Sequence, residues 1–182
     1  MKFTPLSLDG SVIIELVPMG DERGSFTRTF CEKEFVSHGL NPRIAQRNLS
    51  YNKRRGTLRG LHFQAPPHAE AKLIRCTRGA VFDVIVDLRP WSPHFREWLG
   101  IELREGDGKM LYVPERFAHG YQTLEDDTEL DYQMSEFFEP TFQMGIRWND
   151  PTLRIRWPED NRIISKRDSS FPFLSEIDLG AS

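Results

Sequence analysis

The sequence predicts an all-β protein, built as a sandwich or barrel with a few short helices. Short segments rich in β-branched and aromatic residues recur along the 182 residues, and Gly and Pro separate them. This spacing of strands is typical of sandwiches and barrels. The sequence contains no repeat, low-complexity linker or change of composition, so we expect one domain over residues 1–182.

The first half supplies one clear strand and one helix. Val12–Val17 is a β-branched run that Pro18 ends. Glu32–His38 is the only segment of the first half with a clearly helical pattern, and one or two further helical turns are expected near the C-terminus. The helical content is therefore expected to be small.

Glycine-containing turns predict two β-hairpins in the middle of the chain. The first joins Lys72–Cys76 to Ala80–Leu88 through Thr77-Arg78-Gly79. The second joins Leu99–Leu103 to Lys109–Val113 through residues 105–108. A further strand is expected at Thr128–Met134, where apolar and polar residues alternate weakly.

Two carboxylates lie on one face of the strand expected at residues 80–88. Asp83 and Asp87 alternate there with Val81 and Ile85, because successive side chains of a strand point to opposite faces. The two aspartates could be exposed on an edge strand. Alternatively, this face lines a barrel interior, where polar groups commonly contact a ligand.

Composition excludes several classes of protein. The formal net charge of −3 gives no global basic field for nucleic acid, although Lys53-Arg54-Arg55 could bind a small anion. No apolar run approaches the length of a membrane span, and the N-terminus lacks the apolar core of a signal peptide. Cys31 and Cys76 form neither a metal-binding spacing nor a disulfide framework. We therefore expect a soluble cytoplasmic protein.

The run from Arg59 to Gln64, with Lys72 beyond it, is the most informative stretch for function. It places the imidazole of His62 between a guanidinium and an amide, with an ammonium nearby. Such a group can abstract a proton beside a carbonyl and stabilise the resulting negative charge. The alternative is a structural histidine in a strand, which is the commoner role of a single histidine.

The spacing around two histidines resembles the cupin superfamily, whose members are small jelly-roll barrels. Gly56 precedes His62 by six residues, and His119 follows Pro114 by five. Metal-binding cupins have a second histidine two residues after the first, where this chain has Gln64. Divalent metals require three or four ligands, so we expect no metal site. The histidines would then be free for acid–base chemistry.

Ten segments together resemble the dTDP-4-dehydrorhamnose 3,5-epimerase family, a metal-free branch of the cupins. They occur in the family's order over nearly the whole chain. The matching segments are Arg23–Phe26, Gln46–Ser50, Leu58–Gln64, Lys72-Leu73, Asp83–Arg89, Phe117–Gly120, Tyr132, Trp148–Pro151, Ile155–Pro158 and Ser165–Asp168.

The resemblance implies a nucleotide-sugar epimerase acting on a 4-keto-6-deoxyhexose, expected to be dTDP-linked, in deoxysugar or polysaccharide biosynthesis. Inversion at C3, C5 or both would follow proton abstraction alpha to the ketone, without a cofactor. The resemblance also implies a homodimer formed through the sheets, with N-terminal residues contributing to the neighbouring site. Two alternatives remain open: a non-catalytic cupin that binds a nucleotide sugar, and a related keto-sugar isomerase.

The resemblance assigns catalytic roles to four residues. His62 corresponds to the base, since an imidazole titrates near neutral pH, and Asp168 to the carboxylate that orients it. Tyr132 corresponds to the acid that returns a proton, and Lys72 to the cation near the enolate oxygen. Individually these residues could be a core tyrosine, a turn cap or an edge charge. Their joint occurrence in the family's order favours the catalytic interpretation.

The resemblance also implies a set of substrate-binding residues. One group would hold the nucleotide and its diphosphate, and guanidinium groups suit a diphosphate. Phe138 stands where the family usually has a tyrosine that stacks on the base, and Arg167 replaces a lysine. Asp83 is a possible partner of the substrate-contacting His119. The expected substrate-binding set is Arg23, Phe26, Gln46, Asn48, Arg59, Lys72, His119, Phe138 and Arg167.

Three positions depart from the family pattern and could alter specificity. Arg28 and Gln143 each stand where the family has a carboxylate in its ligand-binding set. Arg116 replaces a glycine and is expected to add bulk near His119. The departures indicate either an altered ligand or neutral drift at the rim of the pocket.

Overall fold

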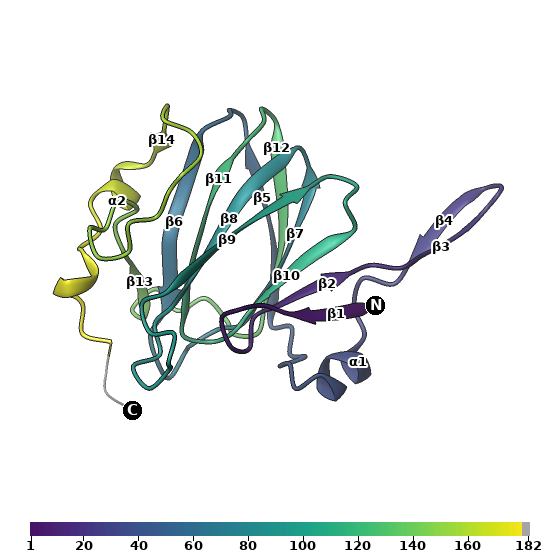
Figure 1. Cartoon of the computed structure of the whole chain (residues 1–182), viewed down its shortest axis with the longest axis horizontal. Helices are drawn as coiled ribbons and strands as arrows, with labels where there is room; N and C mark the ends of the chain where they lie inside the picture. The colour runs from purple at the N-terminus through teal and green to yellow at the C-terminus, as the bar shows by residue number, and fades with distance from the viewer. Residues whose placement is uncertain (180–182) are drawn as a thin grey trace.

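Two β-sheets face each other in the computed structural model, which describes residues 1–179 (Figure 1). The first sheet has the strand order β1-β2-β10-β7-β12-β5. Its strands are β1 (Lys2–Pro5), β2 (Val12–Glu15), β5 (Gln46–Asn52), β7 (Lys72–Arg78), β10 (Lys109–Val113) and β12 (Thr128–Met134).

The second sheet has the order β13-β6-β11-β8-β9, and the short β14 pairs with β6. Its strands are β6 (Thr57–Gln64), β8 (Ala80–Asp87), β9 (Trp98–Arg104), β11 (Phe117–Thr123), β13 (Gln143–Gly145) and β14 (Ile163–Ile164). This is the all-β, jelly-roll architecture that the sequence predicts, and it closes most strand edges by pairing.

The two expected hairpins are wrong, because both tight turns carry the chain from one sheet to the other. β7 pairs with β10 and β12, whereas β8 pairs with β9 and β11. β10 likewise pairs with β2 and β7 and not with β9. At the first turn, Gly79 has a φ of 71°, and a Cβ there would meet Thr128 Oγ1 at 2.5 Å. The turn residues were recognised correctly, but the partners of the strands were not.

Other expected elements are confirmed with small changes. β12 spans Thr128–Met134 as expected, and α1 spans Glu32–Ser37, one residue shorter than expected. The first expected strand ends at Glu15, before the chain leaves the body at Pro18. Near the C-terminus, α2 (Lys166–Ser169) and a 3₁₀ turn at Leu174–Glu176 supply the short helical turns.

The main core lies between the sheets and contains apolar side chains from both, including Ile74 and Leu130 of the first sheet and Ile85 of the second. The outer face of the second sheet is packed against the C-terminal region, for example through Trp157 and Leu174. The C-terminal segment is thereby held beside β6, where it can contribute to a site.

Asp83 and Asp87 are fully buried, which confirms that their face of β8 lines the interior. Asp87 accepts hydrogen bonds from Arg89 and Ser92. Burial opposes its ionisation, but these bonds lower the pKa of Asp87 below its ordinary value. Asp83 has a different partner, described below.

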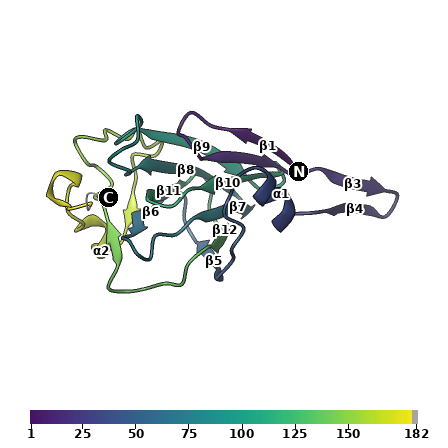
Figure 2. The ribbon, with the colours of Figure 1, turned by 90° about the horizontal axis from the view of Figure 1, so that it is seen from below.

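A β-hairpin of β3 (Pro18–Asp21) and β4 (Gly24–Thr27) projects from the body as an arm (Figures 1 and 2). It pairs only with itself, forming a separate two-stranded sheet. Met19 and Phe26 are 64% and 71% exposed on this arm. Among residues 1–179, no helix is long and apolar enough to cross a membrane.

Candidate active site

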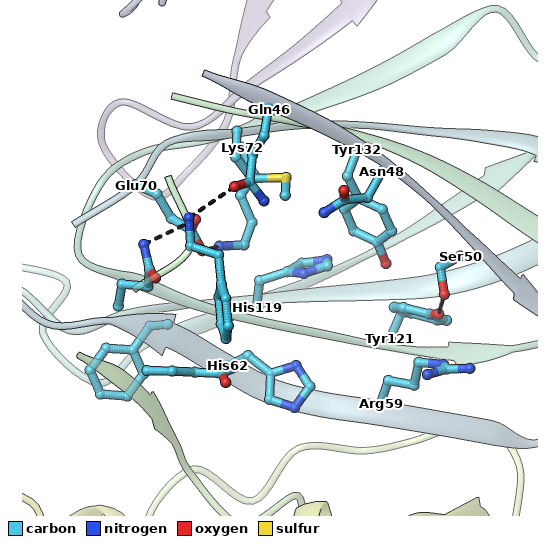
Figure 3. Close-up of a pocket in the computed structure, with 15 residues that line it drawn as sticks. Gln46, Asn48, Ser50, Arg59, His62, Glu70, Lys72, His119, Tyr121 and Tyr132 are labelled. Carbon is cyan, nitrogen blue, oxygen red and sulfur yellow. Dashed lines mark hydrogen bonds and ion pairs between the residues drawn. The ribbon is translucent and has the colours of Figure 1, made fainter. Parts of the chain in front are cut away.

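A cavity of about 300 Å³ opens between the two sheets (Figure 3). Side chains from β5, β7 and β12 form one wall, and side chains from β6 and β11 form the other. Its polar lining comprises Gln46, Asn48, Ser50, Arg59, His62, Gln64, Glu70, Lys72, His119, Tyr121, Tyr132 and Gln143. The structure therefore gathers most of the residues that the sequence predicts for the site.

His62 and Asp168 form a dyad at one wall of the cavity. His62 Nε2 lies 3.0 Å from Asp168 Oδ1, and the Gly60 backbone N–H donates to Asp168 Oδ2 at 3.0 Å. Burial alone would raise the pKa of Asp168, but the His62 ring, the Gly60 N–H and the contact with Ser165 lower it below its usual value. A charged Asp168 can orient the imidazole and stabilise its protonated form.

Close backbone contact between β6 and β11 sets the position of His62. Gly60 has a φ of 120°, and a Cβ there would meet the Gly120 Cα at 2.6 Å and the His119 carbonyl oxygen at 2.9 Å. The register between the two strands shifts immediately beyond His119, which pairs with His62. Glycine is required here because it alone combines the backbone angle with the missing side chain.

The ring of Phe171 supports His62 from the side. The two rings are 5.6 Å apart and nearly perpendicular. Phe171 fits because Gly145, which pairs with His62, has no side chain: a Cβ there would meet the Phe171 ring at 2.5 Å. The C-terminal segment thus supplies both a hydrogen-bond partner and a packing partner to His62.

Lys72 enters the cavity from β7 and pairs with the carboxylate of Glu70. Lys72 is only 8% exposed, and Figure 3 shows the pair on the wall opposite His62. The other carboxylate oxygen of Glu70 faces Gln64 Nε2 at 3.4 Å. Gln64 also bonds the backbone at His68 and Glu139. The amide that replaces a second histidine is therefore part of the framework that holds Glu70 and Lys72.

His119 forms a second, deeper dyad with Asp83. Its Nε2 atom lies 2.9 Å and 3.0 Å from the two carboxylate oxygens, which bears out the pairing expected from polarity. Both side chains are buried. Burial raises the pKa of Asp83, and the neighbouring His119 opposes that rise. The rings of His119 and Tyr132 lie close to perpendicular, with their centres 5.9 Å apart.

Tyr132 stands on β12, in the sheet opposite the one that carries His62. Burial raises the pKa of Tyr132 well above its usual value, and the nearby Tyr121 and Asp83 add to the rise, whereas Arg59 opposes it. The hydroxyl therefore stays protonated over the whole physiological range and can act as a proton donor.

The residues expected around a nucleotide lie in two places. Gln46, Asn48 and Phe138 line the cavity mouth, where Gln46 accepts a hydrogen bond from the Phe138 backbone N–H at 2.8 Å. Arg167 lies beyond His62, in a second recess of about 430 Å³ that also contains Arg59, His62 and Asp168. The two recesses share Arg59 and His62 among their lining residues.

Two family departures touch each other. Arg167 donates a hydrogen bond to Gln143, which lines the cavity. Arg167, expected to replace a lysine, thus contacts Gln143, expected to replace a carboxylate. The Arg167 guanidinium also lies over the Phe171 ring. The two changes are coupled in space although 24 residues separate them.

The structure does not bring Arg23, Phe26 and Arg28 to the cavity of their own chain. Arg23 and Phe26 lie on the projecting arm, where Arg23 pairs with Asp21. Arg28 pairs with Glu34 of α1 at 3.1 Å.

The expectation that Arg116 adds bulk near His119 is wrong. Its side chain lies over the Trp91 ring and is absent from the cavity lining. Arg116 has a φ of 64°, which explains why glycine suits this position: the turn requires a left-handed backbone.

Sequence reasoning missed Glu70, Tyr121 and Ser50 as members of the site. Tyr121 could have been found, because it lies two residues after His119 and so shares its face of β11. Ser50 belongs to a segment that matched the family, in alternation with Gln46 and Asn48. Glu70 lies in an irregular loop, where sequence spacing carries no such signal. Among residues 1–179, no three His, Cys, Asp or Glu side chains are grouped closely enough to hold a metal ion.

The chain matches the family model described as dTDP-4-dehydrorhamnose 3,5-epimerase over residues 5–176. The epimerase of that name from Methanothermobacter thermautotrophicus is 42% identical over 96% of this chain and 95% of its own length. The crystal structure of the enzyme from Elizabethkingia anophelis is similar with a TM-score of 0.94 and 36% identity, covering 97% of each chain. A dTDP-4-dehydrorhamnose 3-epimerase from Streptomyces niveus is 36% identical over 97% of this chain and 85% of its own length.

Proposed function

This chain belongs to the dTDP-4-dehydrorhamnose 3,5-epimerase family, and from that premise we propose that its cavity epimerises a dTDP-linked 4-keto-6-deoxyhexose. The protein is an isomerase of deoxysugar biosynthesis. The observation that carries the proposed mechanism is the position of His62 and Tyr132 on opposite sheets. An epimerase must remove a proton from one face of the sugar and return one to the other. A base and an acid on facing walls match that requirement.

His62 acts as the base in this mechanism. The C3 and C5 hydrogens of the substrate are acidic because they lie alpha to the C4 ketone. The imidazole removes one of them, and the charged Asp168 stabilises the imidazolium that forms. The half-buried His62 ring lines the cavity, so a sugar can approach it.

Lys72 and Arg59 stabilise the enolate that results. Negative charge moves to the C4 oxygen, and the Lys72 ammonium on the opposite wall of the cavity supplies a cation. Glu70 and Gln64 hold that ammonium in place. Tyr132 then donates its proton to the carbon from the face opposite His62, which inverts the centre. The ketone activates the carbon acid, so the mechanism uses no cofactor.

The nucleotide extends outward from the sugar. The aromatic face of Phe138 offers a surface for the base at the mouth, beside Gln46 and Asn48. Arg59 and Arg167 both line the second recess, and guanidinium groups suit a diphosphate. The contact between Arg167 and Gln143 makes these two residues the leading candidates for a change in ligand preference.

The arm completes the site of a second copy in a homodimer. Arg23 and Phe26 are far more exposed than a ligand-binding pair requires, and the arm reaches away from the body of its own chain (Figure 2). The cytoplasmic location expected from the free Cys31 and Cys76 stays a prediction.

Complementation between two inactive variants tests the shared site. His62→Asn and Arg23→Glu should each be inactive alone, and mixing them under conditions of subunit exchange should restore part of the activity. Mixed dimers would then contain one intact site. No recovery despite demonstrated exchange, or a monomer by light scattering, would contradict the arrangement.

Deuterium wash-in tests the reaction itself. The protein is incubated with dTDP-4-keto-6-deoxyglucose in heavy water, and C3 and C5 are followed by NMR. Exchange at both carbons identifies a 3,5-epimerase, and exchange at C3 alone identifies a 3-epimerase such as the Streptomyces niveus relative. Tight binding without exchange at either carbon would contradict the proposal and indicate a binding protein. A 3-keto product would indicate the isomerase.

A further inference from the structure

The acid of this mechanism must recover a proton after each donation. Tyr132 becomes a phenolate when it protonates the carbon, while the proton that was removed stays on His62, on the opposite wall. The bound sugar separates the two groups. A route that refills Tyr132 must therefore lie on its own side of the cavity.

A second tyrosine lies beside Tyr132 and forms a hydrogen bond with Ser50, which lines the cavity. Tyr121 comes from β11, and its ring centre is 6.4 Å from that of Tyr132. The Tyr121 hydroxyl is 2.8 Å from Ser50 Oγ and donates to Asn52 Oδ1 at 3.1 Å. Tyr121 is only 2% exposed, whereas Ser50 is half-buried at the cavity wall beside the exposed Asn48 (Figure 3).

We propose that Tyr121 and Ser50 form a proton relay that returns a proton to Tyr132 after it has acted. This inference rests on the proposed epimerase function. The Tyr121 O–H turns from Asn52 to the Tyr132 oxygen, its O–H bond breaks, and the O–H bond of Tyr132 forms again. Ser50 passes its proton to Tyr121 and takes one from water at the cavity. One proton enters from solvent, and His62 later releases one.

The surroundings favour this direction of transfer. Burial raises the pKa of Tyr121, but Ser50, Arg59, Asn52 and Tyr132 all oppose the rise. Around Tyr132, burial, Tyr121 and Asp83 raise the pKa and only Arg59 opposes it. A negative charge therefore costs less on Tyr121 than on Tyr132. Arg59 also donates to the same Asn52 oxygen at 2.8 Å, which holds its guanidinium near the relay.

Tyr121→Phe removes the hydroxyl and keeps the ring. It therefore tests the return of a proton to Tyr132 separately from the donation of a proton to the carbon. With enzyme in excess, inversion of the first carbon should proceed at the wild-type rate, because Tyr132 starts protonated. With substrate in excess, we expect a burst of one inverted carbon per site and then turnover slower by about tenfold. The slow phase should be slower still in heavy water, unlike a phase limited by product release. Ser50→Ala should show the same burst with a smaller loss.

Tyr112→Phe is the matched control, because it removes a tyrosine hydroxyl outside the cavity, where it accepts from the Asn41 backbone N–H at 3.0 Å. It should show no burst. Unchanged turnover in Tyr121→Phe would overturn the relay. The relay would also be overturned if the rate of the first inversion fell as much as the rate of later turnovers. If Tyr121→Phe does not fold by circular dichroism, Ser50→Ala decides the question on the same criteria. A wild-type protein that exchanges neither carbon would instead contradict the proposed function.

Discussion

The imidazole of His62 and the carboxylate of Asp168 meet at 3.0 Å although 106 residues separate them in the chain. The contact forms because α2 docks against β6 and its buried Asp168 also accepts the Gly60 N–H. One end of the chain thereby fixes the orientation of a side chain near its middle. In the proposed mechanism, the base depends on this docking.

Asp168→Asn should lower kcat by about a hundredfold, since a neutral amide cannot stabilise an imidazolium. Steady-state kinetics measures the loss of kcat, and a separate assay of dTDP binding shows whether affinity has changed as well. Unchanged kcat would contradict the role of Asp168.

The same substitution should change how stability depends on pH. The pKa of Asp168 is lowered in the folded protein, so its charge stabilises the fold above the pKa of an unfolded aspartate, about 3.9. That contribution is lost as pH falls through the lower folded value. The stability difference between wild type and Asp168→Asn should therefore hold from pH 7 to about pH 5 and shrink toward pH 3. Thermal melts across this range measure it, and a difference that grew on acidification would refute the assignment.

Lys72→Met should reduce kcat by about a hundredfold with a smaller change in KM, because the cation acts mainly on the charge that develops in the enolate. Glu70→Gln leaves the ammonium in the cavity, so we expect a loss of less than about tenfold. Lys53→Met removes an exposed loop lysine and serves as the control. A rise in KM alone would show that Lys72 binds substrate without stabilising the enolate.

Gly60→Ala should destabilise the protein by about 3 kcal/mol or more, because the added methyl group would strike the Gly120 backbone in a strained conformation. Gly24→Ala is a matched comparison, since Gly24 has a φ of 134° with nothing within 4 Å of an added Cβ. It should cost only the conformational strain, about 1 kcal/mol. Urea unfolding measures both, and equal losses would contradict the steric explanation.

The sequence was sufficient to predict the fold class and most of the cavity lining. Alternating strands with Gly and Pro between them indicated the sandwich, and the segments around His62, Lys72 and Tyr132 indicated the chemistry. Strand partners were less predictable, because a turn such as the one at Gly79 reverses the chain equally well within a sheet or between two sheets.

Local sequence was also insufficient for residues whose role depends on a distant contact. Glu70 becomes significant only because Lys72 turns back toward it inside the cavity. Arg116 gave a misleading signal. It precedes His119 by three residues in the sequence, but its side chain lies over the Trp91 ring. Arg23 lies on the projecting arm, away from the cavity of its own chain, and its sequence segment gives no sign of that placement.

The most direct test of the central claim is deuterium wash-in with His62→Asn beside the wild type. Asparagine can keep a hydrogen bond to Asp168 but cannot accept a proton from carbon. With dTDP-4-keto-6-deoxyglucose in heavy water, the wild type should exchange C3, C5 or both, and the folded His62→Asn variant should exchange neither. Exchange by the variant at the wild-type rate would contradict His62 as the base.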